Sequence, residues 1–174
     1  IATLPGMRER TVTLNGFSKT YAMTGWRVGY LAAPGDFVAR LTEPRHTLSI
    51  NTCTISQYAA LAALTGPQAP VQAMLADYAA RRAWLMPALT AAGFTYGHPG
   101  GAFYIYTNIS STGLDAPEFC ERLLADTGVM VFPGTMFGDD SRHYIRISYL
   151  QPLPRIQEAM ARIAAFTSKV RAGA

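Results

Sequence analysis

The sequence predicts an α/β protein in which the chain passes from one domain to another along a long helix near residue 75. Two observations carry this prediction: two short strand patterns flank a loop early in the chain, and strands alternate with helices beyond residue 93. The 174 residues, of which 49% are hydrophobic and 15% charged, suffice for one sizeable core or for one domain plus part of another. We therefore divide the chain into residues 1–75 and 76–174, joined through the long helix.

In the first part, two strand patterns enclose a loop. The stretch "RTVTLNGF" alternates apolar and polar residues and then breaks at Asn15 and Gly16, which predicts a strand that ends in a turn. The stretch "WRVGYLAAP" is rich in aromatic and aliphatic residues and predicts a second strand, closed by Pro34. Helical spacing follows over residues 36–48 and 54–64, with Asp36 and Thr54 as candidate N-caps and Gly66-Pro67 as a stop.

In the second part, a long helix comes first. Its apolar face is formed by Val71, Met74, Leu75, Tyr78, Leu85 and Leu89. Gly93 marks its end, Pro87 should bend its last turns, and Arg81 and Arg82 fall off the apolar face, which predicts that they are solvated. Strands are then predicted at 94–96, 102–107, 129–132 and 144–149, and helices at 116–127 and 153–170, the last with a buried stripe of Ile156, Met160, Ile163 and Phe166.

Composition and charge exclude several classes of function. The net charge of +4 comes without any dense run of lysine or arginine, so we expect no nucleic-acid partner. No apolar run approaches the length of a membrane span, and the first residues lack the pattern of a signal peptide, so we expect neither a membrane protein nor an exported one. The chain starts at Ile1 and runs almost at once into a strand pattern, which suggests a piece of a longer protein.

The cysteines and histidines indicate no metal site. Cys53 and Cys120 fit no zinc spacing, and a chain of this size has no need of disulfides, so buried free thiols in a reducing, cytoplasmic setting are expected. His46, His98 and His143 are scattered along the chain without metal-ligand spacing. We therefore predict no bound metal.

The loop between the first two strands carries a candidate reactive amine. In "NGFSKTYAMTGWRVGY", Lys19 and Arg27 are the only charged residues, and the apolar neighbours of Lys19 predict a pocket that lowers its proton affinity. An unprotonated amine attacks carbonyls, while Ser18 and the planar fork of Arg27 suit phosphate oxygens. An aldehyde that bears a phosphate would satisfy both cations. The alternatives are a solvated lysine and an arginine that caps a helix or pairs with a surface acid.

A second candidate lies near the other end of the chain. Strand alternation puts Tyr144, Arg146 and Ser148 on one face, so the Arg146 guanidinium would lie on a sheet face where it needs an anionic partner. A substrate carboxylate bound through two hydrogen bonds meets that need. The alternative is an ion pair with an acid of this chain, Asp139 or Asp140.

Together these residues resemble a known family. Gly16-Phe17-Ser18-Lys19, then Ala22-Met23, Gly25 and Arg27-Val28-Gly29, resembles the attachment signature of class I/II aminotransferases, which are pyridoxal-phosphate enzymes of fold type I. The resemblance implies that Lys19 forms a Schiff base with pyridoxal 5'-phosphate and moves the substrate proton, while Ser18 and Arg27 hold the phosphate. One departure is Gly16, because many relatives carry serine three positions before the lysine.

The resemblance extends to the second part of the chain. The pattern "VxxxPGxxFG" followed by "YIRIS" resembles the family segment whose strand arginine binds the substrate α-carboxylate, which implies that role for Arg146. The stretch "PGGAFYIY" is similar to the family's "GAFY" strand, although its glycines could be only a turn. The implied fold is the C-terminal part of a fold type I enzyme: a remnant of the large, cofactor-binding domain over residues 1–75 and the α/β small domain over residues 76–174.

The resemblance also implies what the whole protein does. It would transfer an amino group between an amino acid and a 2-oxo acid, as a homodimer, with further cofactor-binding groups in an N-terminal half that has no counterpart here. The chain alone is therefore expected to be weak or inactive. Two alternatives stay open: a pyridoxal-phosphate carbon–sulfur lyase on the same fold, and the aminotransferase-like effector domain of a transcription regulator. The sequence does not indicate which amino acid is used.

Overall fold

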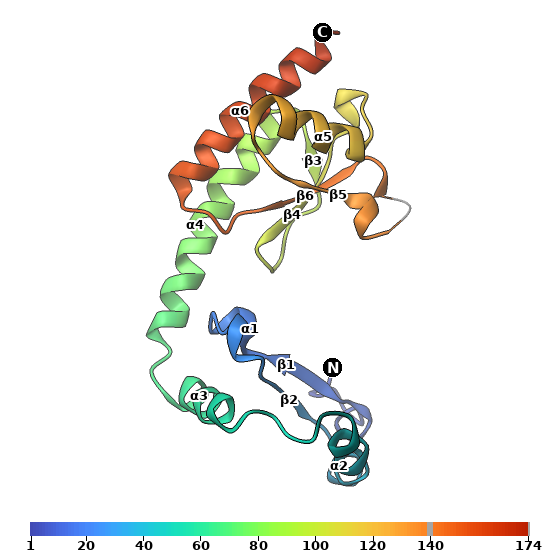
Figure 1. Cartoon of the computed structure of the whole chain (residues 1–174), viewed down its shortest axis with the longest axis vertical. Coiled ribbons are helices and arrows are strands. Elements are labelled where there is room, and N and C mark those ends of the chain that lie inside the picture. Colours follow the sequence, from blue (N-terminus) through green and yellow to red (C-terminus); the bar gives the residue numbers. More distant parts are fainter. Residues whose placement is uncertain (139–140, 174) are drawn as a thin grey trace. The chain divides into compact units, whose positions relative to one another are not determined.

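A computed structural model describes residues 1–138 and 141–173, and the chain divides into two compact units (Figure 1). The first unit comprises Ile1–Ala73 and the second Met74–Ala174. No helix within the described ranges is both long enough and apolar enough to cross a membrane.

The first unit contains the two strands and the two longer helices that the sequence predicts, and its strands pair as an antiparallel ribbon. Its elements are η1 (Arg8–Arg10), β1 (Thr13–Gly16), α1 (Phe17–Thr20), η2 (Thr24–Trp26), β2 (Gly29–Ala32), α2 (Gly35–Ser49) and α3 (Thr54–Thr65). Gly66 ends α3, as expected. The predicted N-caps are wrong: Pro34 precedes α2 and Cys53 precedes α3, while Asp36 lies in the first turn, where an acid favours the helix dipole.

The ribbon is held in register by close backbone approach at its loop end. Thr13 lies opposite Ala32 and Gly16 opposite Gly29. A Cβ atom at Gly29 would lie 2.8 Å from the backbone oxygen of Asn15, so this position admits only glycine without a shift of the strand. The loop that contains Lys19 therefore leaves and rejoins the ribbon at two glycines.

The second unit is a sheet covered on one side by helices. Its sheet has the order β3-β4-β6-β5 and is antiparallel throughout. The strands are β3 (Thr95–Tyr96), β4 (Tyr104–Asn108), β5 (Phe132–Pro133) and β6 (Tyr144–Ser148), and the helices are α4 (Ala69–Ala91), η3 (Ser110–Thr112), α5 (Ala116–Thr127), η4 (Gly134–Met136) and α6 (Leu153–Arg171). Helices α5 and α6 and the C-terminal half of α4 lie on the same side of the sheet (Figure 1). The predicted α/β layout is confirmed.

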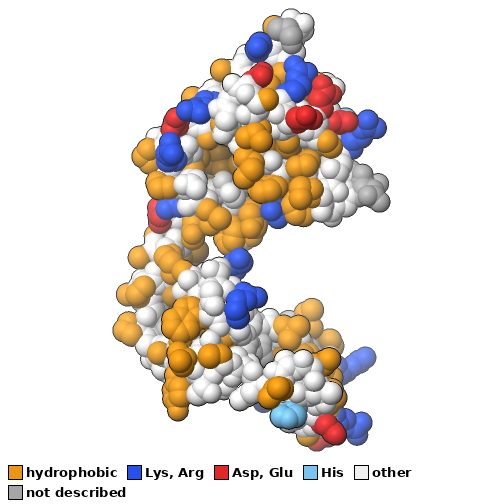
Figure 2. Space-filling model, in the orientation of Figure 1, with side chains coloured by type: hydrophobic (Ala, Val, Ile, Leu, Met, Phe, Trp, Pro, Cys, Tyr) orange, Lys and Arg blue, Asp and Glu red, His pale blue; other side chains and the backbone are white. Residues whose placement is uncertain are grey.

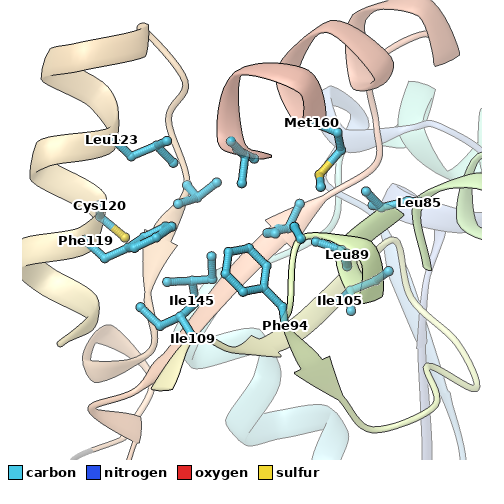
Figure 3. Packing of buried hydrophobic residues seen from close by; sticks show 14 of the residues in the cluster. Leu85, Leu89, Phe94, Ile105, Ile109, Phe119, Cys120, Leu123, Ile145 and Met160 are labelled. Carbon is cyan, nitrogen blue, oxygen red and sulfur yellow. The ribbon is translucent and has the colours of Figure 1, made fainter. Parts of the chain in front are cut away.

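The core of the second unit lies between the sheet and these helices. Side chains from both layers converge there, as Figure 3 shows for Phe94, Ile105 and Ile145 from the strand side and Leu89 and Leu123 from the helices. The predicted stripe of α6 is confirmed, because Ile156, Met160, Ile163 and Phe166 are all buried. Burial of this many apolar side chains supplies the main stabilisation of the unit.

Helix α4 ends as predicted, but its two arginines, Arg81 and Arg82, bind backbone carbonyls. The amide of Phe94 donates to the Leu89 carbonyl around Gly93, whose φ of 79° is the left-handed conformation of a helix C-terminal glycine. The prediction that Arg81 and Arg82 are solvated is wrong. Arg81 donates to the Leu150 carbonyl at 2.5 Å, and Arg82 to the Pro99 carbonyl at 2.9 Å.

Candidate active site

Lys19 lies on a single helical turn that follows β1 directly. Phe17, two residues before Lys19, is buried together with Met23 and Ala60 and anchors the turn. The Phe17 amide donates to the Val28 carbonyl at 3.3 Å. Ser18 is half-buried, and Lys19 is exposed. The anchored residue Phe17 therefore fixes the base of the loop, while the next two residues present a hydroxyl and an amine at its surface.

The apolar pocket predicted around Lys19 is not present in this unit. Of the neighbours on which that prediction rested, Phe17 and Met23 are buried in a cluster of their own, and Trp26 is 44% exposed. The prediction failed because apolar neighbours in sequence turn toward their own core, leaving the lysine side chain outside it.

Arg27 closes the same loop in a strained conformation. Its φ of 49° and ψ of 49° are left-handed, as is the φ of 54° at Ala22, and each costs about 1–2 kcal/mol outside glycine. Strained residues of this kind cluster at functional sites. Arg27 Nη1 donates to the Thr24 carbonyl at 2.9 Å, so the helix-capping alternative is realised in part, but the exposed guanidinium has further N–H groups to offer.

The donor set of this loop fits a phosphorylated aldehyde. The amine of Lys19, the hydroxyl of Ser18 and the guanidinium of Arg27 all belong to the connection between β1 and β2, and none of the three residues is fully buried. An amine suits the aldehyde, whereas a hydroxyl and a guanidinium suit phosphate oxygens. Among the described residues, no group of three or more His, Cys, Asp or Glu is arranged to hold a metal ion.

Arg146 lies in the central strand β6 of the second unit. Ile145 and Ile147 point into the core, and the half-buried Arg146 lies on the opposite face of the sheet, as alternation predicts. Its Nε atom is buried and has no hydrogen-bond partner in the described part of the chain. A buried guanidinium N–H without an acceptor is costly, which favours an anionic ligand at this position.

The internal ion pair considered for Arg146 involves Asp139 and Asp140, and both lie outside the described residues. The five ion pairs found among the described residues do not include Arg146. No described residue therefore supplies an acidic partner for its guanidinium.

Sequence reasoning missed the aromatic surroundings of Arg146. Its guanidinium carbon lies 4.4 Å from the ring centroid of Tyr104, 5.4 Å from that of Phe132 and 4.1 Å from that of Phe137. These rings stand in the stretches "GAFY" and "VFPGTMFG", so the signal was present in the sequence. Only the strand pairing and the η4 turn show that the rings converge on one side chain.

Comparison with known proteins gives the context of both regions. The family model described as aminotransferase class I and II matches residues 2–163. The chain is 42% identical over 167 residues to aromatic-amino-acid aminotransferase 2 of Thermococcus litoralis and 41% identical over 165 residues to an aspartate aminotransferase of Pyrococcus abyssi, with 94% of this chain and 42% of each relative covered. The crystal structure of an aromatic aminotransferase from Pyrococcus horikoshii matches with a TM-score of 0.90 and 39% identity, over 97% of this chain and 45% of that one.

These matches share two properties. Nearly all of this chain is covered in each, and the chain spans less than half the length of each relative. The structural match has the mixed α/β architecture described above. The chain belongs to the class I and II aminotransferase family.

Proposed function

We propose that this chain supplies the cofactor lysine and the carboxylate arginine of a pyridoxal-phosphate-dependent amino acid aminotransferase. The observation that carries the proposal is the loop between β1 and β2, where Ser18, Lys19 and Arg27 are presented at the surface by an anchored turn. Relatives that are named aminotransferases support it, although the chain spans less than half of their length.

Each residue has a stated task in this proposal. Lys19 Nζ would hold the cofactor and, once released from it, would take the proton that leaves the substrate α-carbon, which requires the unprotonated amine. The Ser18 hydroxyl and Arg27 N–H groups donate to the phosphate, and Arg146 binds the α-carboxylate of the amino acid or 2-oxo acid. When bound, pyridoxal phosphate supplies the electron sink for this proton transfer.

The setting of the whole protein is also proposed. We infer a homodimer of longer chains, as the family resemblance implies, in the cytoplasm, which is consistent with the two free cysteines. Light scattering of the natural full-length protein tests the dimer; a monomer at micromolar concentration would contradict it.

The lysine assignment can be tested by reductive trapping, because the chain has only two lysines, Lys19 and Lys169. The full-length protein is treated with pyridoxal phosphate and borohydride, and the labelled peptide is mapped. We expect the label on Lys19, its loss in Lys19→Ala, and no change in the matched variant Lys169→Ala. Label on another lysine in wild type refutes the assignment, and product analysis of the same protein separates transamination from carbon–sulfur lysis.

The arginine assignment needs a separate test, because acids of this chain are the competing partners. In the full-length protein, Arg146→Lys should raise KM for the amino acid about tenfold or more, since a lysine cannot form the bidentate pair. The double variant Asp139→Asn/Asp140→Asn should leave KM within about twofold. An unchanged KM in Arg146→Lys would contradict the carboxylate role and would leave the internal ion pair as the alternative.

We expect the 174-residue chain alone to show no transamination. The groups that stack on the cofactor ring and keep its nitrogen protonated belong, by resemblance, to a part of the family that has no counterpart in this sequence, and without them the cofactor is a poor electron sink. The assay follows transfer from aspartate or an aromatic amino acid to 2-oxoglutarate. Robust turnover by the pure chain would contradict this expectation.

A further inference from the structure

Three aromatic rings from two stretches of the chain surround the Arg146 guanidinium. Two ring centroids, those of Tyr104 and Phe137, lie at 4.4 and 4.1 Å from its central carbon, and that of Phe132 lies at 5.4 Å. A cation within about 6 Å of a ring centroid is attracted by the face of the ring, most strongly where water is absent. We call Tyr104 and Phe137, the two nearer rings, the aromatic clamp.

The clamp shields the guanidinium without satisfying its hydrogen bonds. Arg146 is half-buried and its Nε atom is buried, but no described residue accepts from that N–H. Aromatic faces attract the charge but are poor hydrogen-bond acceptors. The arrangement therefore restricts the orientation of the planar group while the described residues leave its Nε–H unpaired, which is how a site for a planar anion is prepared before the anion binds.

Strand register places two of the rings. Phe132 of β5 lies directly opposite Arg146, and Tyr104 of β4 lies opposite Ser148, which makes it the diagonal neighbour of Arg146 on the same face. Diagonal neighbours on one face are within reach of aromatic and long side chains. A slip of one residue in β4 would remove Tyr104 from this face.

The η4 turn places the third ring. Phe137 follows η4, and its amide donates to the Gly134 carbonyl at 2.7 Å. Gly134 is buried so closely against the sheet that an added Cβ would lie 2.5 Å from the Tyr106 hydroxyl and 2.6 Å from the Tyr144 carbonyl. Because Gly134 has no side chain, the turn can pack directly against β4 and β6. This packing places the Phe137 ring next to the guanidinium.

We propose that Tyr104 and Phe137 are positioning residues for Arg146, which hold its guanidinium in one orientation and exclude water from it so that its N–H edge meets a carboxylate. This inference rests on the proposed role of Arg146. The two rings thereby set the affinity for the carboxylate, although they act only through the arginine. The phenol hydroxyl of Tyr104 has no part in this, so a phenylalanine should serve as well.

The test uses nuclear magnetic resonance of the labelled 174-residue chain and the Nε–Hε signal of Arg146, assigned by its loss in Arg146→Lys. The first measurement, without any ligand, is the rate of rotation about the Nε–Cζ bond and of Hε exchange with water. The second is titration with propionate, a monocarboxylate without an amino group, at constant ionic strength. The variants are Tyr104→Leu, Phe137→Leu, the conservative Tyr104→Phe, and Met136→Ala, a matched control at an exposed residue next to Phe137.

We expect slow rotation and exchange in wild type, Tyr104→Phe and Met136→Ala. In each leucine variant both rates should rise, and the Kd for propionate should increase about two- to thirtyfold. The amide signals of β6 report whether a variant keeps the sheet. Fast rotation about the Arg146 Nε–Cζ bond in the wild-type chain would by itself refute the positioning role of the two rings.

The outcomes separate the clamp from the proposed function. If propionate binds the wild type and each folded leucine variant equally well, the clamp is refuted and the carboxylate role of Arg146 stands. If propionate leaves the wild-type Arg146 signal unmoved, the carboxylate role fails and the positioning role fails with it, whereas the trapping of Lys19 is unaffected.

Discussion

At the scale of single residues, the two thiols of the chain lie in opposite environments. Cys53 is exposed and precedes α3, where hydrogen bonding from the Ser56 backbone amide lowers its pKa below the usual value of 9.0. Cys120 is buried on α5, and burial raises its pKa to about 11. The expectation of two buried thiols is therefore right for Cys120 and wrong for Cys53.

This difference predicts selective alkylation. At pH 8 a thiol with a pKa of about 11 is about one part in a thousand thiolate, and an ordinary thiol is about a tenth thiolate or more. Because Cys53 is exposed and its pKa is lowered, Cys53 should react about a hundredfold faster than Cys120 or more. Iodoacetamide labelling of the folded chain followed by peptide mass spectrometry measures both rates. The variant Cys53→Ser should lose the fast phase; equal rates in the wild type would contradict the prediction.

Asp115 couples the stability of the second unit to pH. Its side chain accepts from the Glu118 amide at 3.1 Å as the N-cap of α5, and this hydrogen bond, aided by Arg142, lowers the pKa of the carboxyl below 3.8. A depressed folded pKa gives stability that is present above the unfolded value and is lost as pH falls through the folded value.

The variant Asp115→Asn isolates this effect, because asparagine keeps a capping oxygen but does not titrate. In urea unfolding the wild type should be the more stable protein at pH 7, and its advantage should shrink as the pH falls from about 5 toward 3. Glu158, whose pKa is lowered by Arg155 and Arg162, is present in both the wild type and the variant. Its titration therefore changes the stability of both proteins with pH and cancels in their difference. A constant difference between the two proteins from pH 7 to 3 would rule out the coupling.

At the scale of elements, the η4 turn depends on one glycine. An alanine at Gly134 would place its Cβ 2.6 Å from two backbone carbonyls, those of Ser141 and Tyr144, and neither can move as a flexible side chain does. We expect Gly134→Ala to lower the free energy of unfolding by about 1–3 kcal/mol, the usual cost of overpacking. Gly97 is the matched control, because nothing lies within 4 Å of a Cβ built there and Gly97→Ala should change stability by less than about 0.5 kcal/mol. Urea midpoints of the two variants provide the comparison. Equal midpoints would show that the turn shifts to accommodate the added Cβ without loss of stability.

The elements were predictable where local pattern decides them. The span of α5 and the buried stripe of α6 follow from apolar spacing, and strand alternation put Arg146 on the correct face. What local pattern could not supply was the partner of each polar group. Arg82 donates to the Pro99 carbonyl, and Phe137 lies against Arg146 after a turn; no helical or strand period brings either pair of residues together. The signature around Lys19 could be recognised, but its exposure depends on where the core of its unit lies.

At the scale of the whole molecule, the two units differ in how much core they contain. Residues 1–73 are all described, and their buried apolar cluster consists of Phe17, Met23 and Ala60. Many large apolar side chains of α3 remain at the surface, where Figure 2 shows orange patches; they are Ile55, Tyr58, Leu61 and Leu64. Both strands of the ribbon are exposed almost throughout. A two-stranded ribbon with so little core is marginal by itself.

This difference predicts that the units lose structure separately in hydrogen exchange of the isolated chain. Amides of β4 and β6, above a core that includes Leu89, Ile105 and Ile145, should be protected about a thousandfold or more, because they exchange only through unfolding of that unit. Amides of β1 and β2 should exchange within about tenfold of an unstructured peptide, because little apolar burial opposes their opening. The single tryptophan of each unit, Trp26 and Trp84, permits an independent check by fluorescence in urea with Trp26→Phe and Trp84→Phe, where the signal of Trp26 should change at the lower concentration. Coincident transitions and equal protection would mean that the chain unfolds as one cooperative body, so that the small core of the first unit does not limit its stability.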